Sequence, residues 1–429
     1  MPARPGVRAG AFAIADQVLL SLANLAAGLA LARELTPAAF GAYVVAFAVL
    51  LIGSSVQVAL VTDPLVIFGS PRTGASQARY FAALLRIQII LASSLAVTLG
   101  LTAFGLQVAW GQTSEIPIAL FGVAIVVIPL QVQWFLRSVF FARLRPATVF
   151  WNDLLGAILR LALLAALILS DRLSAFTALL ASGLGGLAAT AAALPACRDL
   201  VIAGAESMKA VWAQHWQYGR WLLATSGAYW CSGQAPALLA SIVLSPVAAA
   251  VIKACQLIVA PLNVALTGLD GVVAPRASRT CAAEGEEALR RFCRRFAMLA
   301  AGGAILYGAL MLPFTSSLME FIYEGRYSGY ASIVAVLMLD ALLAAAARAP
   351  VLRMKVLGET RRIFAAYAWS AAAGLACLAL LAPLYGILGA AIAAPVASGV
   401  LLLLVFFAPR QVSEPSVEAP IPAIVLPEA

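Results

Sequence analysis

Charged residues and histidine are scarce in this chain. Only 11% of its 429 residues are charged, whereas an average globular domain has about 25%. A single histidine, His215, is present, and it lies in a predicted cytoplasmic segment. The sequence also lacks the GxSxG, HExxH and glycine-rich phosphate-binding patterns. One histidine cannot build a histidine-based catalytic centre or a multi-histidine zinc site, so no enzyme class is predicted.

Cysteine is equally uninformative about redox or metal chemistry. None of the six forms a CxxC pair, and none lies in a predicted outer loop. We therefore expect small buried or cytoplasmic side chains, with no disulfide, no metal and no cofactor. These cysteines are Cys197, Cys231, Cys255, Cys281, Cys293 and Cys377.

Long apolar runs are what the chain does have. It is 63% hydrophobic, with a mean hydropathy of +0.98. Continuous runs near the ~20 residues that cross a bilayer predict transmembrane helices, and they lack the alternation of a barrel strand. The sequence predicts an all-α polytopic membrane protein with twelve spans, at about 12–32, 40–62, 82–104, 116–136, 147–169, 174–195, 221–244, 247–270, 296–318, 331–348, 363–382 and 384–408.

The basic residues follow these spans. If the N-terminus is cytoplasmic, 23 of the 28 Lys and Arg fall on the cytoplasmic side, three (Arg33, Arg172 and Arg326) fall outside, and two (Arg160 and Lys253) lie within spans. Positive charge resists translocation, so this pattern predicts a multi-pass protein with both termini cytoplasmic. The net charge of +9 is divided among short loops. It therefore indicates contact with anionic lipid in the bilayer and no nucleic-acid partner.

The chain divides into two predicted halves. The longest cytoplasmic segment, 196–220, separates an N-terminal six-helix bundle (1–195) from a C-terminal six-helix bundle (221–409), and a proline-rich tail (410–429) is expected to be disordered. Leu35-Thr36-Pro37-x-Ala39 matches Leu244-Ser245-Pro246-x-Ala248 at an equivalent outer loop. Pro64 and Pro275, and the Arg137/Arg145 and Arg353/Arg361 pairs, match at similar offsets. These matches predict a parallel internal repeat about an axis along the membrane normal.

Two predicted helices carry polar residues on one face. Span one has Gln17, Ser21, Asn24 and Gly28, and span eight has Lys253, Gln256, Asn263, Thr267 and Asp270. Polar groups at membrane depth face protein or water. We expect helices one, seven and eight to line a shared aqueous cavity between the halves. Interhelical hydrogen bonds in a tightly packed bundle remain the alternative.

Single ionisable residues within spans are the sharpest candidates. Lys253 fits a cavity-facing ammonium that binds an anionic group, although it could also extend to the outer surface. Arg160 lies deeper, and Asp153, seven residues earlier on the same face, could pair with it. Asp16, Asp340 and Asp270 are candidates for a coupling residue or a counter-ion.

A further stretch, 284–296 (EGEEALRRFCRRF), shows the pattern of a surface helix. Leu289, Phe292, Cys293 and Phe296 recur at helical spacing, and four arginines fill the opposite face. We expect this helix to lie on the inner membrane surface and to anchor the orientation, with partner docking as the alternative.

The motifs resemble those of a known family. The first outer loop, Ala32-Arg33-Glu34-Leu35-Thr36-Pro37-Ala38-Ala39-Phe40-Gly41-Ala42-Tyr43, is similar to the N-terminal helix pair of bacterial polysaccharide transporters. Tyr218-Gly219-Arg220-Trp221, Leu244-Ser245-Pro246 and Ala260-Pro261-Leu262-Asn263 resemble the start of their second half. Those transporters form the oligosaccharide-flippase branch, including O-antigen flippases, of the multidrug/oligosaccharidyl-lipid/polysaccharide (MOP) superfamily. The resemblance implies twelve helices in two V-arranged, MATE-like bundles.

The resemblance also implies a function. Members of the branch flip undecaprenyl-pyrophosphate-linked oligosaccharide from the cytoplasmic to the outer leaflet of the inner membrane, and the resemblance implies other polysaccharide-assembly proteins as partners. In relatives, basic residues on helices one, two and eight face the cavity. Lys253 matches the helix-eight position, Arg33 lies at the outer end of helix one, and helix two has no basic residue. The alternatives are a cation-coupled drug or metabolite antiporter of the same superfamily and, against the short outer loops, a membrane glycan polymerase or ligase.

Overall fold

The computed structural model describes residues 5–110, 114–202, 204, 206–233 and 235–407, and within these ranges it is helical, with no strand. The N-terminal half comprises α1 (Pro5–Glu34), α2 (Pro37–Gln57), the π-helix η1 (Val58–Thr62), α3 (Asp63–Gly69), α4 (Gly74–Trp110), α5 (Glu115–Ala142), α6 (Pro146–Leu169), α7 (Ala175–Ala193), the 3-10 helix η2 (Leu194–Cys197) and α8 (Arg198–Ile202).

The C-terminal half begins with α9 (Met208–Gly233) and α10 (Ala235–Val243). It continues with α11 (Pro246–Met311), the 3-10 helix η3 (Leu312–Phe314), α12 (Thr315–Tyr323), the 3-10 helix η4 (Ser328–Tyr330), α13 (Ala331–Val356) and α14 (Thr360–Phe407). The predicted tail at 410–429 lies outside the described residues.

The described helices are consistent with twelve spans. Among the described residues, ten helical segments are long and apolar enough to span a membrane. One of them, Arg361–Phe407, contains two helices that meet at Gly386, whose φ of 59° reverses the chain. The predicted seventh span corresponds to the second part of α9 together with α10. The all-α, twelve-helix fold class is therefore confirmed.

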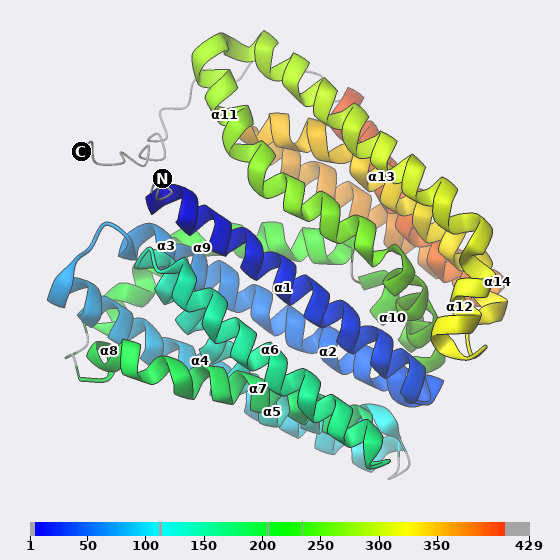
Figure 1. Cartoon of the computed structure of the whole chain (residues 1–429), viewed down its shortest axis with the longest axis horizontal. Coiled ribbons are helices and arrows are strands. Elements are labelled where there is room, and N and C mark those ends of the chain that lie inside the picture. Colours follow the sequence, from blue (N-terminus) through cyan, green and yellow to red (C-terminus); the bar gives the residue numbers. More distant parts are fainter. Residues whose placement is uncertain (1–4, 111–113, 203, 205, 234, 408–429) are drawn as a thin grey trace.

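Figure 1 shows two bundles arranged as a V. Helices α1 to α7 form one arm, and α11, α13 and α14 form the other. The arms converge near α10 and α12 and separate toward the end that holds the N-terminus. We name the converging end the Arg33 end and the diverging end the Arg137 end, after residues that lie there.

The first outer loop and its repeat partner have the same local design. Thr36 is the N-cap of α2 and its side chain accepts a hydrogen bond from the Ala39 amide (3.2 Å), while Pro37 occupies the first helical turn. Ser245 is likewise the N-cap of α11, with Pro246 in the first turn. Proline suits this position because its missing N–H has no helical partner there, so both loops start a helix after two residues.

The predicted surface helix at 284–296 is not a separate element. Gly285, with a φ of 80°, turns the chain inside α11, and residues after it run continuously into the ninth span. The expectation of a helix lying flat on the membrane is therefore wrong. Leu289, Cys293 and Phe296 are buried in the bundle core, which holds this stretch along the bundle.

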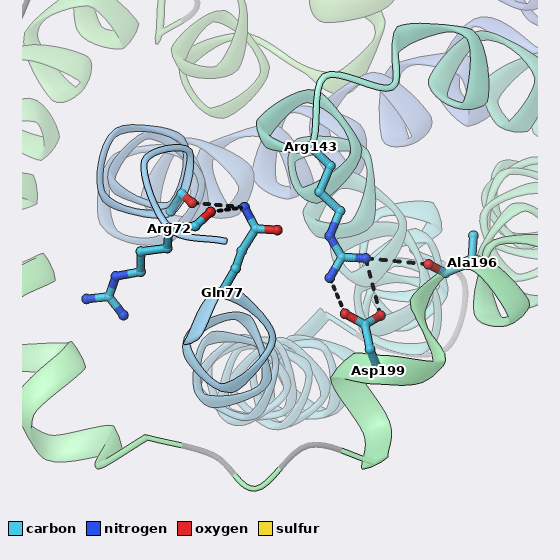
Figure 2. A network of polar contacts seen from close by, with 6 residues as sticks. Arg72, Gln77, Arg143, Ala196 and Asp199 are labelled. Atoms are coloured by element: carbon cyan, nitrogen blue, oxygen red, sulfur yellow. Dashed lines mark hydrogen bonds and ion pairs between the residues drawn. The ribbon is translucent and has the colours of Figure 1, made fainter. Parts of the chain in front are cut away.

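Polar contacts tie together the connections at the Arg137 end of the N-terminal bundle (Figure 2). Arg143, just after α5, binds the Asp199 carboxylate of α8 through two nitrogens (2.5 and 3.2 Å) and donates to the Ala196 carbonyl. Gln77 of α4 donates to the carbonyls of Gly69 (3.0 Å) and Arg72 (2.9 Å). These bonds satisfy carbonyls at the helix ends, which would otherwise lack partners.

The segment predicted as a linker is docked on the N-terminal bundle. His215 of α9 is fully buried and donates from Nδ1 to the Leu60 carbonyl of η1 (2.9 Å), while its Nε2 accepts from the Tyr80 hydroxyl (2.6 Å). Burial lowers the pKa of His215 below 6.5, with the nearby Arg72 acting in the same direction. The lone histidine thus acts as a neutral structural residue at the π-helical turn of the second span.

Candidate functional site

The two halves meet along α1, α2 and α11. A Cβ placed on Gly28 of α1 would lie 2.8 Å from the Leu257 side chain of α11, and one on Gly41 of α2 would lie 1.9 Å from the Pro246 carbonyl oxygen. Phe40 of α2 belongs to the same buried cluster as Val251 of α11. Small residues let the helices touch at the Arg33 end, as in tightly packed membrane helices.

Lys253 lies close to this junction. It is seven residues after the start of α11, about 10 Å along the helix, and one turn before Leu257, which contacts α1. Residues four apart share a helix face, so Lys253 is on the side of α11 directed toward the N-terminal bundle. The residue is half-buried, and within the described part of the chain its ammonium has no hydrogen-bond or ion-pair partner.

The polar stripe of α1 shares a face with Gly28, the residue that meets α11. Gln17 and Asn24 are both exposed, although they lie within a candidate span. On α11, Gln256 is half-buried and Asn263 is exposed. The stripes therefore begin at the helix junction and continue toward the Arg137 end, where the bundles separate (Figure 1). The contribution predicted from span seven falls largely on side chains outside the described residues.

Arg160 joins the α1 stripe. Its Nη1 donates to Asn24 Oδ1 (2.7 Å), which brings a guanidinium from α6 to the middle of that face. The pairing with Asp153 that the sequence left open does not form. The Asp153 carboxylate instead forms an ion pair with Arg137 Nε (2.8 Å) and accepts a hydrogen bond from the Gln133 amide (2.6 Å).

Arg137 is a functional-site residue that sequence reasoning missed. The basic-residue pattern predicts only that it is on the cytoplasmic side; the structure places it near the end of α5, bound to both Asp16 and Asp153. Both carboxylate side chains are fully buried. The available signal was Gln133, which precedes Arg137 by four residues and so shares its helix face. Two buried carboxylates share one guanidinium, so this site carries a formal charge of −1 when both are ionised.

Ionic contacts close the Arg33 end. Arg33 of α1 binds Glu324, just after α12, at 2.5 Å, and Arg326 donates to the Leu35 carbonyl at 2.7 Å. Arg33, a predicted substrate-binding residue, thus forms part of the contact between the two bundles in this conformation. Both contacts link the N-terminal bundle to the C-terminal one.

Two further candidate acids lie elsewhere. Asp340 of α13 accepts a hydrogen bond from Ser398 of α14 (2.6 Å), within the C-terminal bundle. The side chain of Asp270 lies outside the described residues. Among the residues that the structure describes, no group of His, Cys, Asp and Glu has the composition of a metal site.

The arrangement is suited to binding a ligand. The Lys253 ammonium, which has no partner among the described residues, and the Arg160 guanidinium, bonded to a neutral amide, lie beside amide side chains on helices that face each other. These groups present hydrogen-bond donors and positive charge, which favour an anionic, hydroxyl-rich ligand.

Comparison with known proteins identifies the fold. No protein-family model and no curated protein matches the sequence. Among solved structures, the inward-facing form of a multidrug resistance MATE transporter of the MOP superfamily has a TM-score of 0.75 at 13% identity, covering 91% of this chain and 93% of that one. The inward closed form of the lipid II flippase MurJ has a TM-score of 0.68 at 12% identity, covering 92% and 86%.

A further solved structure has the same fold. The outward-facing form of a multidrug resistance MATE transporter has a TM-score of 0.65 at 13% identity, covering 93% of both chains, against 0.75 for the inward-facing form. The chain therefore has the fold of MOP superfamily transporters.

Proposed function

We propose that this protein is a flippase of the bacterial inner membrane that moves undecaprenyl-pyrophosphate-linked oligosaccharide to the outer leaflet for surface polysaccharide synthesis. The two bundles would work by alternating access, with the Arg33–Glu324 ion pair closing the Arg33 end in the arrangement seen here. The Arg33 end would face outward and both termini would be cytoplasmic, as the distribution of basic residues predicts.

The observation that carries this proposal is that Lys253 is unpaired among the described residues at membrane depth. A charged group at membrane depth is costly unless it is paired or faces water. Lys253 has no partner among the described residues and lies on the α11 side directed toward α1. The pyrophosphate of the cargo would supply the missing negative charge. As the cargo moves between the two bundles, it would also meet Arg160, which is bonded to Asn24. Gln17, Gln256 and Asn263 would offer hydrogen bonds to sugar hydroxyls.

The test is surface-glycan export in cells that lack the native gene. Lys253→Ala is expected to abolish export at unchanged protein abundance, whereas Lys253→Arg keeps the charge and part of the activity. Lys355→Ala is the matched control, since Lys355 is exposed at the Arg137 end of α13. Normal export by Lys253→Ala would exclude the proposed role of this residue.

A cation-coupled antiporter is the second candidate, because Asp16 and Asp153 are buried carboxylates within candidate spans. Both are bound to Arg137 and neither faces the α11 stripe, which favours coupling or structural roles over binding of a cationic cargo. Transport assays in proteoliposomes separate the two: accumulation of a cationic drug against a proton or sodium gradient, without any effect of Lys253→Ala, would favour the antiporter.

A further inference from the structure

Four arginines form one exposed face at the start of the second limb of α11, after the turn at Gly285. Arg290, Arg291, Arg294 and Arg295 are all exposed, and in the described part of the chain none has a hydrogen-bond or ion-pair partner. Leu289 and Cys293 on the opposite face are buried. We call the four residues the arginine face. Their positive charge is therefore available to a partner outside the chain.

The arginine face continues directly into an exposed apolar surface. Farther along the same limb, the next exposed large side chains are Met298 (60%), Leu299 (73%), Ile305 (59%), Leu306 (62%) and Leu310 (55%). The pair Met298/Leu299 follows Arg294/Arg295 by four residues, and the pair Ile305/Leu306 follows seven residues later, so these side chains continue the same helix face. Figure 1 shows this limb along the outer edge of the C-terminal bundle. An apolar surface of this extent on a spanning helix is suited to acyl chains.

The charge of the exposed side chains changes sign after the turn at Gly285. Glu284 and Glu287 are exposed at the turn, and the arginines follow on the membrane-proximal side. Arg295 is three residues before Met298, a rise of about 4.5 Å. Guanidinium groups at this level reach lipid phosphates, to which arginine can donate two parallel hydrogen bonds.

We propose that the arginine face binds the headgroups of anionic phospholipids in the adjoining leaflet, with the acyl chains along Met298 to Leu310. The arginine face continues into exposed apolar residues, which favours a resident membrane lipid over the transported cargo. Lys253, the residue proposed to bind the cargo, lies on the other limb of α11. A bound lipid would hold the second limb against the bundle core, beside the Arg353–Glu286 ion pair (2.6 Å).

The test is native mass spectrometry of protein released from vesicles of phosphatidylglycerol and phosphatidylcholine. The wild type is expected to retain phosphatidylglycerol, and a variant with all four arginines replaced by Gln is expected to lose at least tenfold in occupancy. Replacement by Lys keeps the charge but not the paired geometry, so a loss of two- to fivefold is expected.

A matched control removes the same charge from scattered exposed positions, by the substitutions Arg79→Gln, Arg145→Gln, Arg198→Gln and Arg361→Gln. It should retain lipid as the wild type does. Equal loss in the control, or undiminished retention by the arginine-face variant, would overturn the proposal. So would displacement of phosphatidylglycerol by stoichiometric undecaprenyl pyrophosphate, which would assign the face to the cargo. If the quadruple variant does not fold, the Arg290→Gln/Arg294→Gln and Arg291→Gln/Arg295→Gln pairs should each lose about half of the bound lipid.

Discussion

Arg33 and Glu324 are 291 residues apart in the chain, and their side chains meet at 2.5 Å to join the two bundles at the Arg33 end. Both side chains are about half exposed. Such a pair is worth roughly 0.2–1 kcal/mol. In a protein that alternates between two states, this is enough to shift the populations up to about fivefold.

Glu324→Gln is therefore expected to weaken closure of this end. Spin labels at Arg172 and Leu384, both exposed near the Arg33 end on different bundles, report the separation by pulsed electron paramagnetic resonance. We expect a larger population of long distances in Glu324→Gln, and recovery in the exchange Arg33→Glu/Glu324→Arg. A distance distribution that does not change in Glu324→Gln would show that the pair has no part in closure.

Close backbone packing is expected to matter more than this ion pair. A Cβ on Gly41 would lie 1.9 Å from the Pro246 carbonyl oxygen, so Gly41→Ala forces α2 and α11 apart. The same spin labels should then show mainly the long distances, and export should fall. Gly302→Ala is the control, because a Cβ on Gly302 has no atom of another residue within 4 Å. If Gly41→Ala retains the wild-type distances, the two helices do not need this contact.

Local signals made much of the fold predictable. Apolar runs predicted the spans, and Thr36-Pro37 and Ser245-Pro246 predicted where α2 and α11 begin, because capping depends on neighbours within a few residues. The turn at Gly285 was missed, since the amphipathic pattern of 284–296 is the same for a helix on the membrane surface and for the inner end of a spanning helix.

The contacts that shape the candidate site were not predictable in the same way. The role of Arg137 could not be inferred, because its partners, Asp16 and Asp153, come from two other helices. Arg160 could be placed at membrane depth, but its choice of Asn24 over Asp153 depends on how α1 packs on α6. Patterns along a single helix give a face and a depth, and tertiary packing decides the partner.

The buried Arg137 site leads to an asymmetric prediction for stability. Arg137→Leu leaves two buried carboxylates without a cation, and loss of one partner from such a site costs about 3–5 kcal/mol. Asp16→Asn should cost less, because Asp153 still has Arg137 as its partner.

Thermal unfolding in detergent measures both, with Arg145→Leu as a control for an exposed arginine nearby. Adding Asp16→Asn to Arg137→Leu is expected to recover part of the loss. An Arg137→Leu protein as stable as Arg145→Leu would show that the two carboxylates do not depend on Arg137.

The contact of His215 with η1 predicts a dependence of stability on pH. Because its pKa is lowered in the folded protein, the unfolded chain binds more protons at acidic pH. Stability should therefore be constant above about pH 7.5 and should fall as the pH drops below about 6.5, the ordinary value for this group.

Two variants separate protonation from packing. In His215→Gln, the amide can donate to the Leu60 carbonyl and accept from the Tyr80 hydroxyl, so the contact is kept and the loss of stability between pH 6.5 and 5 should shrink. His215→Ala removes both hydrogen bonds and should be less stable at every pH, since a buried carbonyl of the π-helical turn loses its donor. Thermal unfolding of the three proteins from pH 5 to 8 measures this. An undiminished acid response in His215→Gln would place the titrating group elsewhere.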